Sequence, residues 1–255
     1  MIDLKGRIHK ENPMFDENEI LIIIPVYNEE GKIASVLKRL FFEGFRNILI
    51  VNDGSTDHTL QIIKKYNVNV ISYNQNKGVG FALKAGLEYA VKHNYRIIVI
   101  MGGDDQDDPK EIYNLIKPII YDKVDFVQGS RYLKNKHRTF PSKLIETKIF
   151  SFVFSIIARR RVTDASNGFR AINLRKCKSN IERLVKINYF NGYEFEPFLL
   201  LELIKNGYIF KEIHVNKYYN IKKGYSKMRP IISWIEIVIP LFFFPIFHKK
   251  LLRGQ

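Results

Sequence analysis

The feature that most constrains the fold of this chain is a regular alternation of short apolar runs with longer segments of helical period. Parallel strands need crossover connections, so this alternation predicts an α/β fold with a mostly parallel central sheet flanked by helices. The expected strands are Ile20–Val26, Asn47–Val51, Val68–Ser72, Arg96–Met101 and Val124–Gln128, and the expected helices are Glu29–Phe42, Thr56–Tyr66, Gly78–His93 and Pro109–Ile120.

Polar loops follow the first four expected strands. The carboxyl ends of parallel strands meet at one edge of a sheet, and open α/β sheets bind ligands at that edge. Each loop alone is compatible with an ordinary turn or helix cap, but together they predict one ligand-binding crevice. The loops are PVYNEE at 25–30, NDGSTD at 52–57, NKGVG at 76–80 and GGDDQDDP at 102–109.

The last of these loops holds four aspartates and one glutamine at positions 104–108. Carboxylates gathered so closely repel one another unless a cation joins them, and oxygen ligands suit Mg²⁺ or Mn²⁺. Such a metal usually completes its shell with substrate phosphates, so the loop predicts a divalent ion and a phosphate-bearing substrate. Asp107 or Asp108 also suits the N-cap of a helix that starts at Pro109.

Charge is distributed unevenly along the 255 residues, a length that fits one large domain. Residues 1–128 carry 16 Lys and Arg against 18 Asp and Glu, whereas residues 129–255 carry 25 against 8. The basic half suits an anionic membrane surface or an anionic acceptor. No nucleic-acid-binding motif is recognisable, so no nucleic-acid partner is expected. With one cysteine, Cys177, and no signal peptide, we expect a cytoplasmic protein at the inner face of the cell membrane.

The loops, in this order, resemble glycosyltransferase family 2, and most of all its polyprenyl-phosphate sugar synthases. The resemblance runs from about Ile20 to about Pro230 and is carried by PVYNEE, VNDGSTD, MGGDDQDDP, and QGSRY at 128–132 followed by VTDASNGFRA at 162–171. It implies the GT-A fold of nucleotide-diphospho-sugar transferases. The catalytic domain would span residues 1–228, with an N-terminal extension at 1–18 and an apolar, basic tail at 229–255.

The resemblance also implies roles for particular residues in the donor site. Asp104 and Gln106 would hold Mg²⁺ or Mn²⁺ and the donor diphosphate, with Asp105 as a further candidate ligand. Gly102 stands where the family more often has the first aspartate of its D-x-D motif. The residues implied in nucleotide binding are Pro25, Tyr27, Glu29, Asp53, Lys77 and Gly78.

A second set of residues is implied on the acceptor side. Arg131 would face the acceptor phosphate, which a guanidinium binds in bidentate fashion; a structural ion pair is the alternative. Arg170 is a further residue for which a structural role is expected. The acceptor and diphosphate contacts implied by the resemblance are Arg131, Asn167, Gly168, Ser226 and Lys227, and Asp104 and Arg131 are the implied catalytic residues.

The implied reaction is an inverting displacement that moves a sugar from a nucleotide-diphosphate sugar to a lipid phosphate. An acceptor phosphate needs no general base, whereas a sugar hydroxyl does. Family members with hydroxyl acceptors carry a Glu-Asp pair before a helix in the second half of the domain. This chain has YEFE at 193–196 instead, with Glu194 as a possible base. Two alternatives remain: transfer to a sugar hydroxyl in capsule, lipopolysaccharide or glycan assembly, and a non-catalytic module that binds membranes or nucleic acid.

Two apolar segments in the second half are open to more than one interpretation. The expected helix Lys143–Ala158 either covers the sheet, which is the favoured interpretation, or rests on a membrane surface. The run at 231–247 is interrupted by Glu236, Pro240 and Pro245 and falls short of the roughly 20 residues that a membrane span needs. It predicts an interfacial anchor or a contact in a homo-oligomer.

Overall fold

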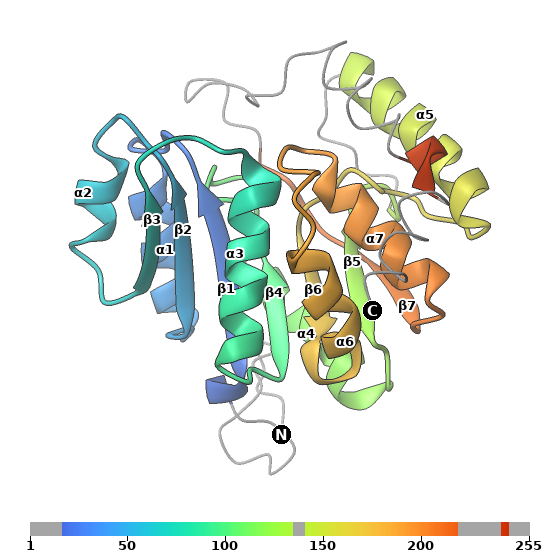
Figure 1. Ribbon diagram of the computed structural model, residues 1–255, viewed down its shortest axis with the longest axis horizontal. Helices are drawn as coiled ribbons and strands as arrows, with labels where there is room; N and C mark the ends of the chain where they lie inside the picture. The colour runs from blue at the N-terminus through green and yellow to red at the C-terminus, as the bar shows by residue number, and fades with distance from the viewer. Residues whose placement is uncertain (1–16, 135–140, 219–240, 245–255) are drawn as a thin grey trace.

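The computed structural model describes residues 17–134, 141–218 and 241–244, which form a seven-stranded sheet with helices on both faces (Figure 1). The strand order is β3-β2-β1-β4-β6-β5-β7. The strands are β1 Ile20–Val26, β2 Ile48–Asp53, β3 Asn69–Tyr73, β4 Ile97–Ile100, β5 Phe126–Ser130, β6 Arg170–Asn173 and β7 Phe210–His214. The helices are η1 Glu17–Glu19, α1 Ile33–Phe42, α2 Thr59–Ile63, α3 Val79–Lys92, η2 Pro109–Glu111, α4 Ile112–Tyr121, α5 Pro141–Ala158, α6 Leu174–Val185 and α7 Phe195–Lys205.

The parallel half of the sheet confirms the prediction from the sequence. β1 pairs in parallel with both β2 and β4, with Ile22 opposite Ile48 on one side and Val99 on the other. β6 was not among the expected strands, and it runs antiparallel to both β4 and β5. The sheet is therefore mixed at its second half, where β5 and β7 are again parallel to each other.

Two expected helices are shorter than their sequence pattern suggests. The first begins at Ile33 rather than at residue 29, and the second covers Thr59–Ile63 rather than residues 56–66. Hydrogen bonds to side chains keep the residues before each helix in a non-helical conformation. The amide N–H of Asn28 donates to Ser55 Oγ (2.9 Å), and that of Thr56 donates to Asn28 Oδ1 (2.8 Å).

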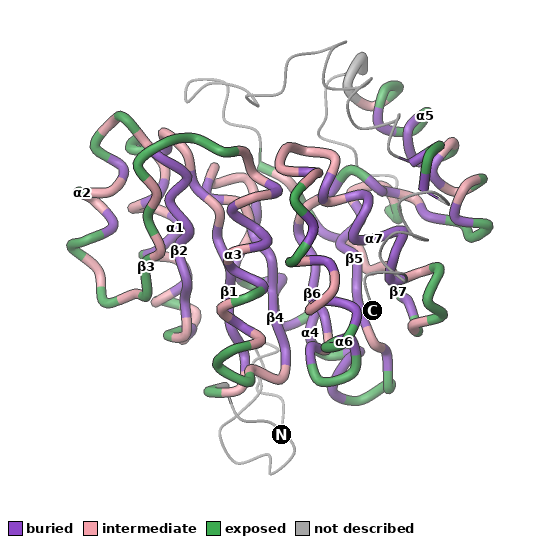
Figure 2. Tube along the Cα trace, in the orientation of Figure 1, coloured by how far each residue is buried: buried purple, intermediate pink, exposed green. Residues whose placement is uncertain are grey.

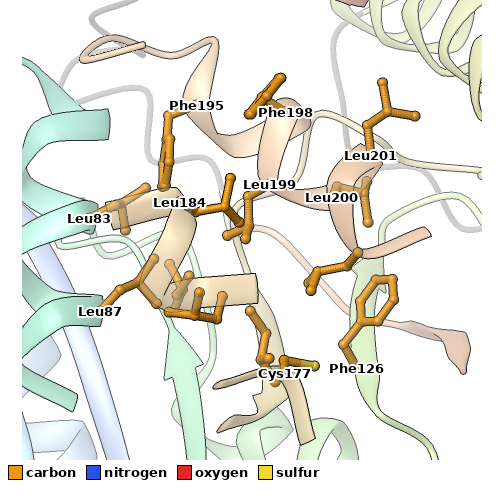
Figure 3. Packing of buried hydrophobic residues seen from close by; sticks show 14 of the residues in the cluster. Leu83, Leu87, Phe126, Cys177, Leu184, Phe195, Phe198, Leu199, Leu200 and Leu201 are labelled. Atoms are coloured by element: carbon orange, nitrogen blue, oxygen red, sulfur yellow. The ribbon is translucent and has the colours of Figure 1, made fainter. Parts of the chain in front are cut away.

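Alternate residues of each strand feed two hydrophobic cores, one on each face of the sheet. Ile22 of β1 faces the core formed with α1, α2 and α4, and Ile23 faces the core formed with α3, α6 and α7. Figure 3 shows the second core, with Leu83 and Leu87 of α3 opposite Leu184 of α6. Burial of each such side chain contributes about 1.5–3 kcal/mol to the stability of the fold. The two cores therefore hold the strands and helices between which the loops run.

Gly86 explains how closely α3 lies on the sheet. A Cβ at this position would stand 2.4 Å from Ile23 Cγ2. A glycine inside a helix costs roughly 0.5–1 kcal/mol relative to alanine, and here it permits direct backbone packing against β1.

The described part of the chain bears on the membrane question as well. Within residues 17–134, 141–218 and 241–244, no helix combines the length and the apolar character needed to cross a bilayer. The expected N-terminal extension and most of the apolar tail lie outside the described residues.

Candidate active site

The edge at which a crevice is predicted is formed by the carboxyl ends of β1, β2, β3 and β4. Because these four strands are parallel, the loops at 27–32, 54–58, 74–78 and 101–108 meet there. β6 runs the opposite way, so its first residue, Arg170, lies at the same edge beside the last residues of β5 and β7. The sheet thus brings the expected donor loops and the expected acceptor loop to one side of the molecule.

The first two loops are fastened to each other. Asn28 adopts a positive φ of 51° and exchanges hydrogen bonds with Ser55 and Thr56. The amide of Glu29 donates to Thr59 Oγ1 (2.7 Å). These contacts fix the backbone on both sides of Tyr27 and Glu29, two residues that the sequence predicts in nucleotide binding. The Glu29 carboxylate lies 3.1 Å from Lys32 Nζ.

Asp53 holds the third loop against the end of β2. Its Oδ1 accepts from the amide of Lys77 (2.9 Å) and its Oδ2 from that of Gly78 (2.7 Å). Gly78 has φ +103°, and a Cβ there would meet Asn191 O at 2.3 Å, so glycine is required. Each carboxylate oxygen keeps a further acceptor position for a ligand donor.

Lys77 extends from this loop over two aromatic rings. Its Nζ lies 5.3 Å from the ring centroid of Tyr73 and 4.6 Å from that of Phe81, and the side chains of both rings are partly buried. The contact holds a positive charge at the rim of the crevice, next to Asp53.

In the acidic loop, Asp104 is the aspartate without an ion-pair partner among the described residues. It is partly exposed, and its Oδ1 accepts from the amide of Gln106 (3.3 Å), whose side chain is also partly exposed. Gly103 lets the loop approach β1, because a Cβ there would meet Val26 Cγ1 at 2.6 Å.

The other three aspartates of the loop are committed to protein contacts. Asp105, with φ +63°, pairs with Arg39 of α1. Asp107 is fully buried, lies 2.8 Å from Lys217 Nζ and accepts from the amide of Gly102 (3.2 Å). Asp108 caps η2 by accepting from the amide of Lys110 (3.1 Å), which confirms one of the two expected caps.

Lys217 was not singled out by the sequence, yet it lies beneath the acidic loop. Burial alone would lower the pKa of its ammonium, but the carboxylates of Asp107 and Asp104 outweigh burial and raise the pKa. The adjacent amide of Tyr218 donates to the backbone carbonyl of Gln106 (2.8 Å). A segment more than a hundred residues away in sequence therefore neutralises and holds the predicted metal loop.

Glu111 anchors the same segment from the other side. Its carboxylate accepts from the amide of Asn216 (2.9 Å) and from Asn216 Nδ2 (2.7 Å). Burial raises the pKa of Glu111 to about 7, in spite of these two hydrogen bonds, which lower it. No local sequence signal marks this pair, because its partners come together only in the folded chain.

Arg131 forms the ion pair that was the alternative interpretation. Its Nε lies 2.7 Å from Asp164 Oδ2 and its Nη2 lies 2.7 Å from Asp164 Oδ1, a bidentate arrangement. Asp164 is fully buried, and Nη2 also donates to Ser166 Oγ (2.7 Å). The guanidinium is thereby fixed in orientation at the end of β5, with its side chain 12% exposed.

Asn167 and Arg170, the first and last residues of the NGFR segment, are both buried. Asn167 is fully buried, donates from Nδ2 to Gly129 O (2.9 Å) and accepts the amide of Phe169 (3.3 Å). Arg170 is 1% exposed and donates to the carbonyls of Asn167 and Glu196, both at 2.9 Å. The expected structural role of Arg170 matches this position, whereas Asn167 supports the backbone instead of presenting its amide to the crevice.

The two glutamates of the YEFE segment face different surroundings. Glu194, the predicted base candidate, accepts from the amide of Gly192 (2.8 Å). Glu196 lies against Gly168, where a Cβ would meet its Oε1 at 2.7 Å. Burial raises the pKa of Glu196, Arg170 and Lys217 oppose this shift, and Asp107 and Asp104 add to it. Glu196 therefore interacts electrostatically with two aspartates of the acidic loop.

Tyr193 interacts electrostatically with carboxylates of both the acidic loop and the YEFE segment. Burial raises the pKa of its phenol, and the carboxylates of Glu196 and Asp104 raise it further. A tyrosine in a YEFE run carries no sequence signal of its own for this placement. Ser226 and Lys227, the remaining acceptor-side predictions, lie outside the described residues.

Within the described ranges, no group of three or more His, Cys, Asp or Glu side chains is arranged to hold a metal ion. The metal-ligand atoms that the acidic loop leaves available are the carboxylate oxygens of Asp104 and the side-chain amide oxygen of Gln106. Such a set fits a Mg²⁺-type ion that takes most of its other ligands from substrate phosphates and water.

Sequence comparison places these residues in a family context. Residues 21–181 match the model of "Glycosyl transferase family 2". An uncharacterized protein of Methanocaldococcus jannaschii is 31% identical over 243 residues, covering 93% of this chain and 98% of that protein. The UDP-N-acetylglucosamine–dolichyl-phosphate N-acetylglucosaminyltransferase of Methanococcus voltae is 36% identical over 186 residues, 65% of this chain and 73% of that enzyme.

Structural comparison gives the same fold. Glucosyl-3-phosphoglycerate synthase from Mycobacterium tuberculosis, solved with Mn²⁺, UDP and glucosyl-3-phosphoglycerate, superposes with a TM-score of 0.65 at 18% identity, covering 88% of this chain and 78% of that one. The mixed sheet with helices on both faces is thus the GT-A arrangement expected from the sequence. Its motif loops, its family match and its relatives together show that the chain belongs to glycosyltransferase family 2.

Proposed function

We propose that this glycosyltransferase moves a sugar from a nucleotide-diphosphate sugar to a polyprenyl-phosphate-type lipid, with inversion at the anomeric carbon and with a divalent ion. The observation that supports the proposal is that Asp104 and Gln106 remain partly exposed, while Asp105 and Asp107 form ion pairs within the protein and Asp108 caps a helix. The relative from Methanococcus voltae, named for transfer to dolichyl phosphate, supports the acceptor class.

Asp104 and Gln106 would hold Mg²⁺ or Mn²⁺ together with oxygens of the donor diphosphate. When bound, such an ion acts as a Lewis acid that stabilises the departing nucleoside diphosphate. The related fold solved with Mn²⁺ and UDP supports this choice of ion and ligand. Lys217, held at 2.8 Å from Asp107, reduces the negative charge that the loop would otherwise present to the diphosphate.

The nucleoside would lie across the first three loops. Asp53 keeps acceptor positions for base or ribose donors while it holds Lys77 and Gly78 in place. Pro25, Tyr27 and Glu29 complete the proposed nucleotide contacts on the loop after β1.

The acceptor phosphate would approach from the side of Arg131 and Gly168. Asp164 sets the orientation of the Arg131 guanidinium, so little side-chain entropy remains to be lost when an anion binds. An oxygen of the acceptor phosphate forms the new bond to the anomeric carbon as the bond to the donor diphosphate breaks, and no base is needed because that oxygen is already anionic. Asn167 supports this wall, and Ser226 and Lys227 are proposed to contact the diphosphate.

The test is transfer by the purified chain. Polyprenyl phosphate would be incubated with a panel of UDP- and GDP-sugars, with Mn²⁺ or with EDTA, and the glycolipid would be identified by mass spectrometry. We expect one donor to give product with the metal and none with EDTA. NMR of the anomeric proton should show inversion. Absence of glycolipid with every donor of the panel contradicts the proposed function.

A second candidate is transfer to a sugar hydroxyl, and Glu196 favours it. Its carboxyl lies against Gly168 and has a raised pKa, as a general base would need. Glu196→Gln should abolish transfer to a hydroxyl acceptor but leave transfer to a lipid phosphate largely intact. Glu194→Gln is the matched control, because Glu194 accepts from Gly192 instead.

A further inference from the structure

The outer face of α5 carries a row of exposed apolar side chains. Ile145, Ile149, Phe152 and Ile156 are 59%, 59%, 67% and 62% exposed. Their spacing of four, three and four residues places them on one side of the helix, over a length of about 16 Å. Figure 2 shows α5 at the edge of the molecule with exposed turns along it. Single exposed apolar residues are ordinary, but a contiguous row marks a binding surface.

The inner face of the same helix is apolar as well. Phe150, Phe154 and Ala158 are 2%, 0% and 5% exposed and belong to the core beneath. The sequence left open whether these apolar residues cover the sheet or meet a membrane, and in the structure one side of α5 belongs to the core while the other is exposed. A helix that is apolar all round needs apolar surroundings on both sides.

Basic residues continue the row at its carboxyl end. Arg159, Arg160 and Arg161 follow α5 directly and are exposed, and α5 itself exposes Lys148 and one acid, Glu146. The guanidinium of Arg160 donates to the carbonyl of Phe210 in β7 (3.2 Å), which leaves Arg159, Arg161 and Lys148 to meet a surface. These basic residues outnumber Glu146, so a second copy of the chain would bring mostly like charges together, whereas an anionic surface complements them. The charge pattern therefore favours a lipid bilayer over self-association.

A second segment exposes apolar side chains next to the same supporting helix. In the turn at 241–244, Leu241 and Phe244 are buried, and the Phe244 ring lies 5.7 Å from that of Phe198 in α7. Phe242 and Phe243 are 62% and 51% exposed. Since α5 also packs on α7, both elements extend apolar groups outward from one support.

α5 is also joined to the acceptor side of the crevice. The hydroxyls of Tyr132 and Thr147 lie 2.5 Å apart, which links the helix to the residue after Arg131. The amide of Ala165 donates to Ser151 Oγ (3.1 Å), which links it to the residue after Asp164. A surface that holds α5 thereby holds the wall that carries Arg131.

We propose that the outer face of α5 docks the protein on an anionic lipid bilayer. Ile145, Ile149, Phe152 and Ile156 lie in the interfacial layer, and Arg159 and Arg161 contact the headgroup phosphates. Docking in this way brings Arg131 and Gly168, the residues proposed to bind the acceptor, to the bilayer surface. That consequence rests on the proposed function, but the docking itself does not.

The test is flotation of the full chain with vesicles of phosphatidylcholine, with or without phosphatidylglycerol, in the absence of any substrate. The wild type should float with the anionic vesicles. The variant Ile149→Gln/Phe152→Gln/Ile156→Gln should bind at least about tenfold more weakly, because binding scales with the apolar area buried. Phe152→Gln alone is compared with Phe42→Gln, which removes a phenylalanine 80% exposed on α1 and should change nothing.

Three outcomes would overturn the proposal: a wild type that does not float, a triple variant that floats as well as the wild type, or a wild-type dimer that light scattering shows to become a monomer in the triple variant. The substituted side chains are exposed, so thermal unfolding should be unchanged and misfolding can be recognised. A chain that binds vesicles but transfers no sugar contradicts the proposed function alone.

Discussion

The two sides of the crevice use their motif residues differently. On the donor side, Asp104 and Gln106 remain partly exposed at the crevice. On the acceptor side, Arg131 is paired with a buried aspartate, and Asn167 and Arg170 are buried and bonded to backbone carbonyls. The donor side thus keeps polar side chains accessible, whereas on the acceptor side many polar side chains form hydrogen bonds within the protein.

The difference has a topological cause. The donor loops follow parallel strands of successive β-α units, so the sheet alone brings them to one edge, and side-chain contacts then join neighbouring loops. The acceptor wall joins β5, the antiparallel β6 and the distant β7, which local connections do not hold together. Ion pairs and buried amides supply the missing constraints there.

The largest effect should come from Asp104→Asn. Loss of this carboxylate removes the charge that would bind the metal and diphosphate, so we expect transfer to fall by about 10²–10⁴-fold, with the urea unfolding midpoint unchanged because Asp104 is partly exposed. Asp108→Asn is the control, since asparagine also caps helices and should leave both measurements near wild type. Equal losses in the two variants would mean that the loop acts only through its overall charge.

The contact between the two sides is tested by Lys217→Met. It leaves the carboxylate of Asp107 buried without its cation, which should cost about 3 kcal/mol of unfolding free energy. Lys211→Met removes a lysine that pairs with Asp122 at the surface and should cost less than about 0.5 kcal/mol. Urea denaturation measures both; similar values would show that the Asp107 site is not a buried ion pair.

Arg131→Lys sharpens the contrast on the acceptor side. Lysine keeps the charge but cannot bridge both oxygens of Asp164, so we expect a loss of about 2 kcal/mol in stability. Arg175→Lys, at a pair with Glu19 in which the arginine side chain is 62% exposed, should change stability hardly at all. If Arg131→Lys unfolds like the wild type but raises the KM for acceptor, Arg131 serves the ligand and not the wall.

The smallest effect concerns pH and Glu111. Its pKa of about 7 in the folded state lies above the ordinary 4.5. Between these values the folded state keeps a proton that the unfolded state releases, so stability falls as pH rises through this window. Glu111→Gln should remove a decline on the order of 1 kcal/mol between about pH 5 and pH 8, allowing for solvent screening. Urea midpoints at both pH values measure it; the control Glu88→Gln, on the exposed side of α3, should keep the wild-type slope.

Much of the donor side was predictable because its signals are local. The apolar runs located β1 to β5 within about two residues, and the polar loops after them identified the crevice edge. Helix lengths were less well predicted, since the hydrogen bonds of Asn28 to Ser55 and Thr56 join two separate loops. β6 and β7 were missed because neither is a continuous apolar run: their sequences are RAIN and FKEIH, whereas the equally short β4 is IIVI.

The sequence by itself determined the β-α order, the position of the polar loops and the family resemblance, because each depends on residues that are close neighbours along the chain. Only the tertiary structure decided which charged residues are available. Asp105 pairs with an arginine 66 positions away, Arg131 with an aspartate 33 positions away, and Asp107 with Lys217 from the far side of the sheet. It also divided α5 into a buried and an exposed apolar face. Pairing and burial depend on contacts between distant segments, and a local pattern of residue types does not contain them.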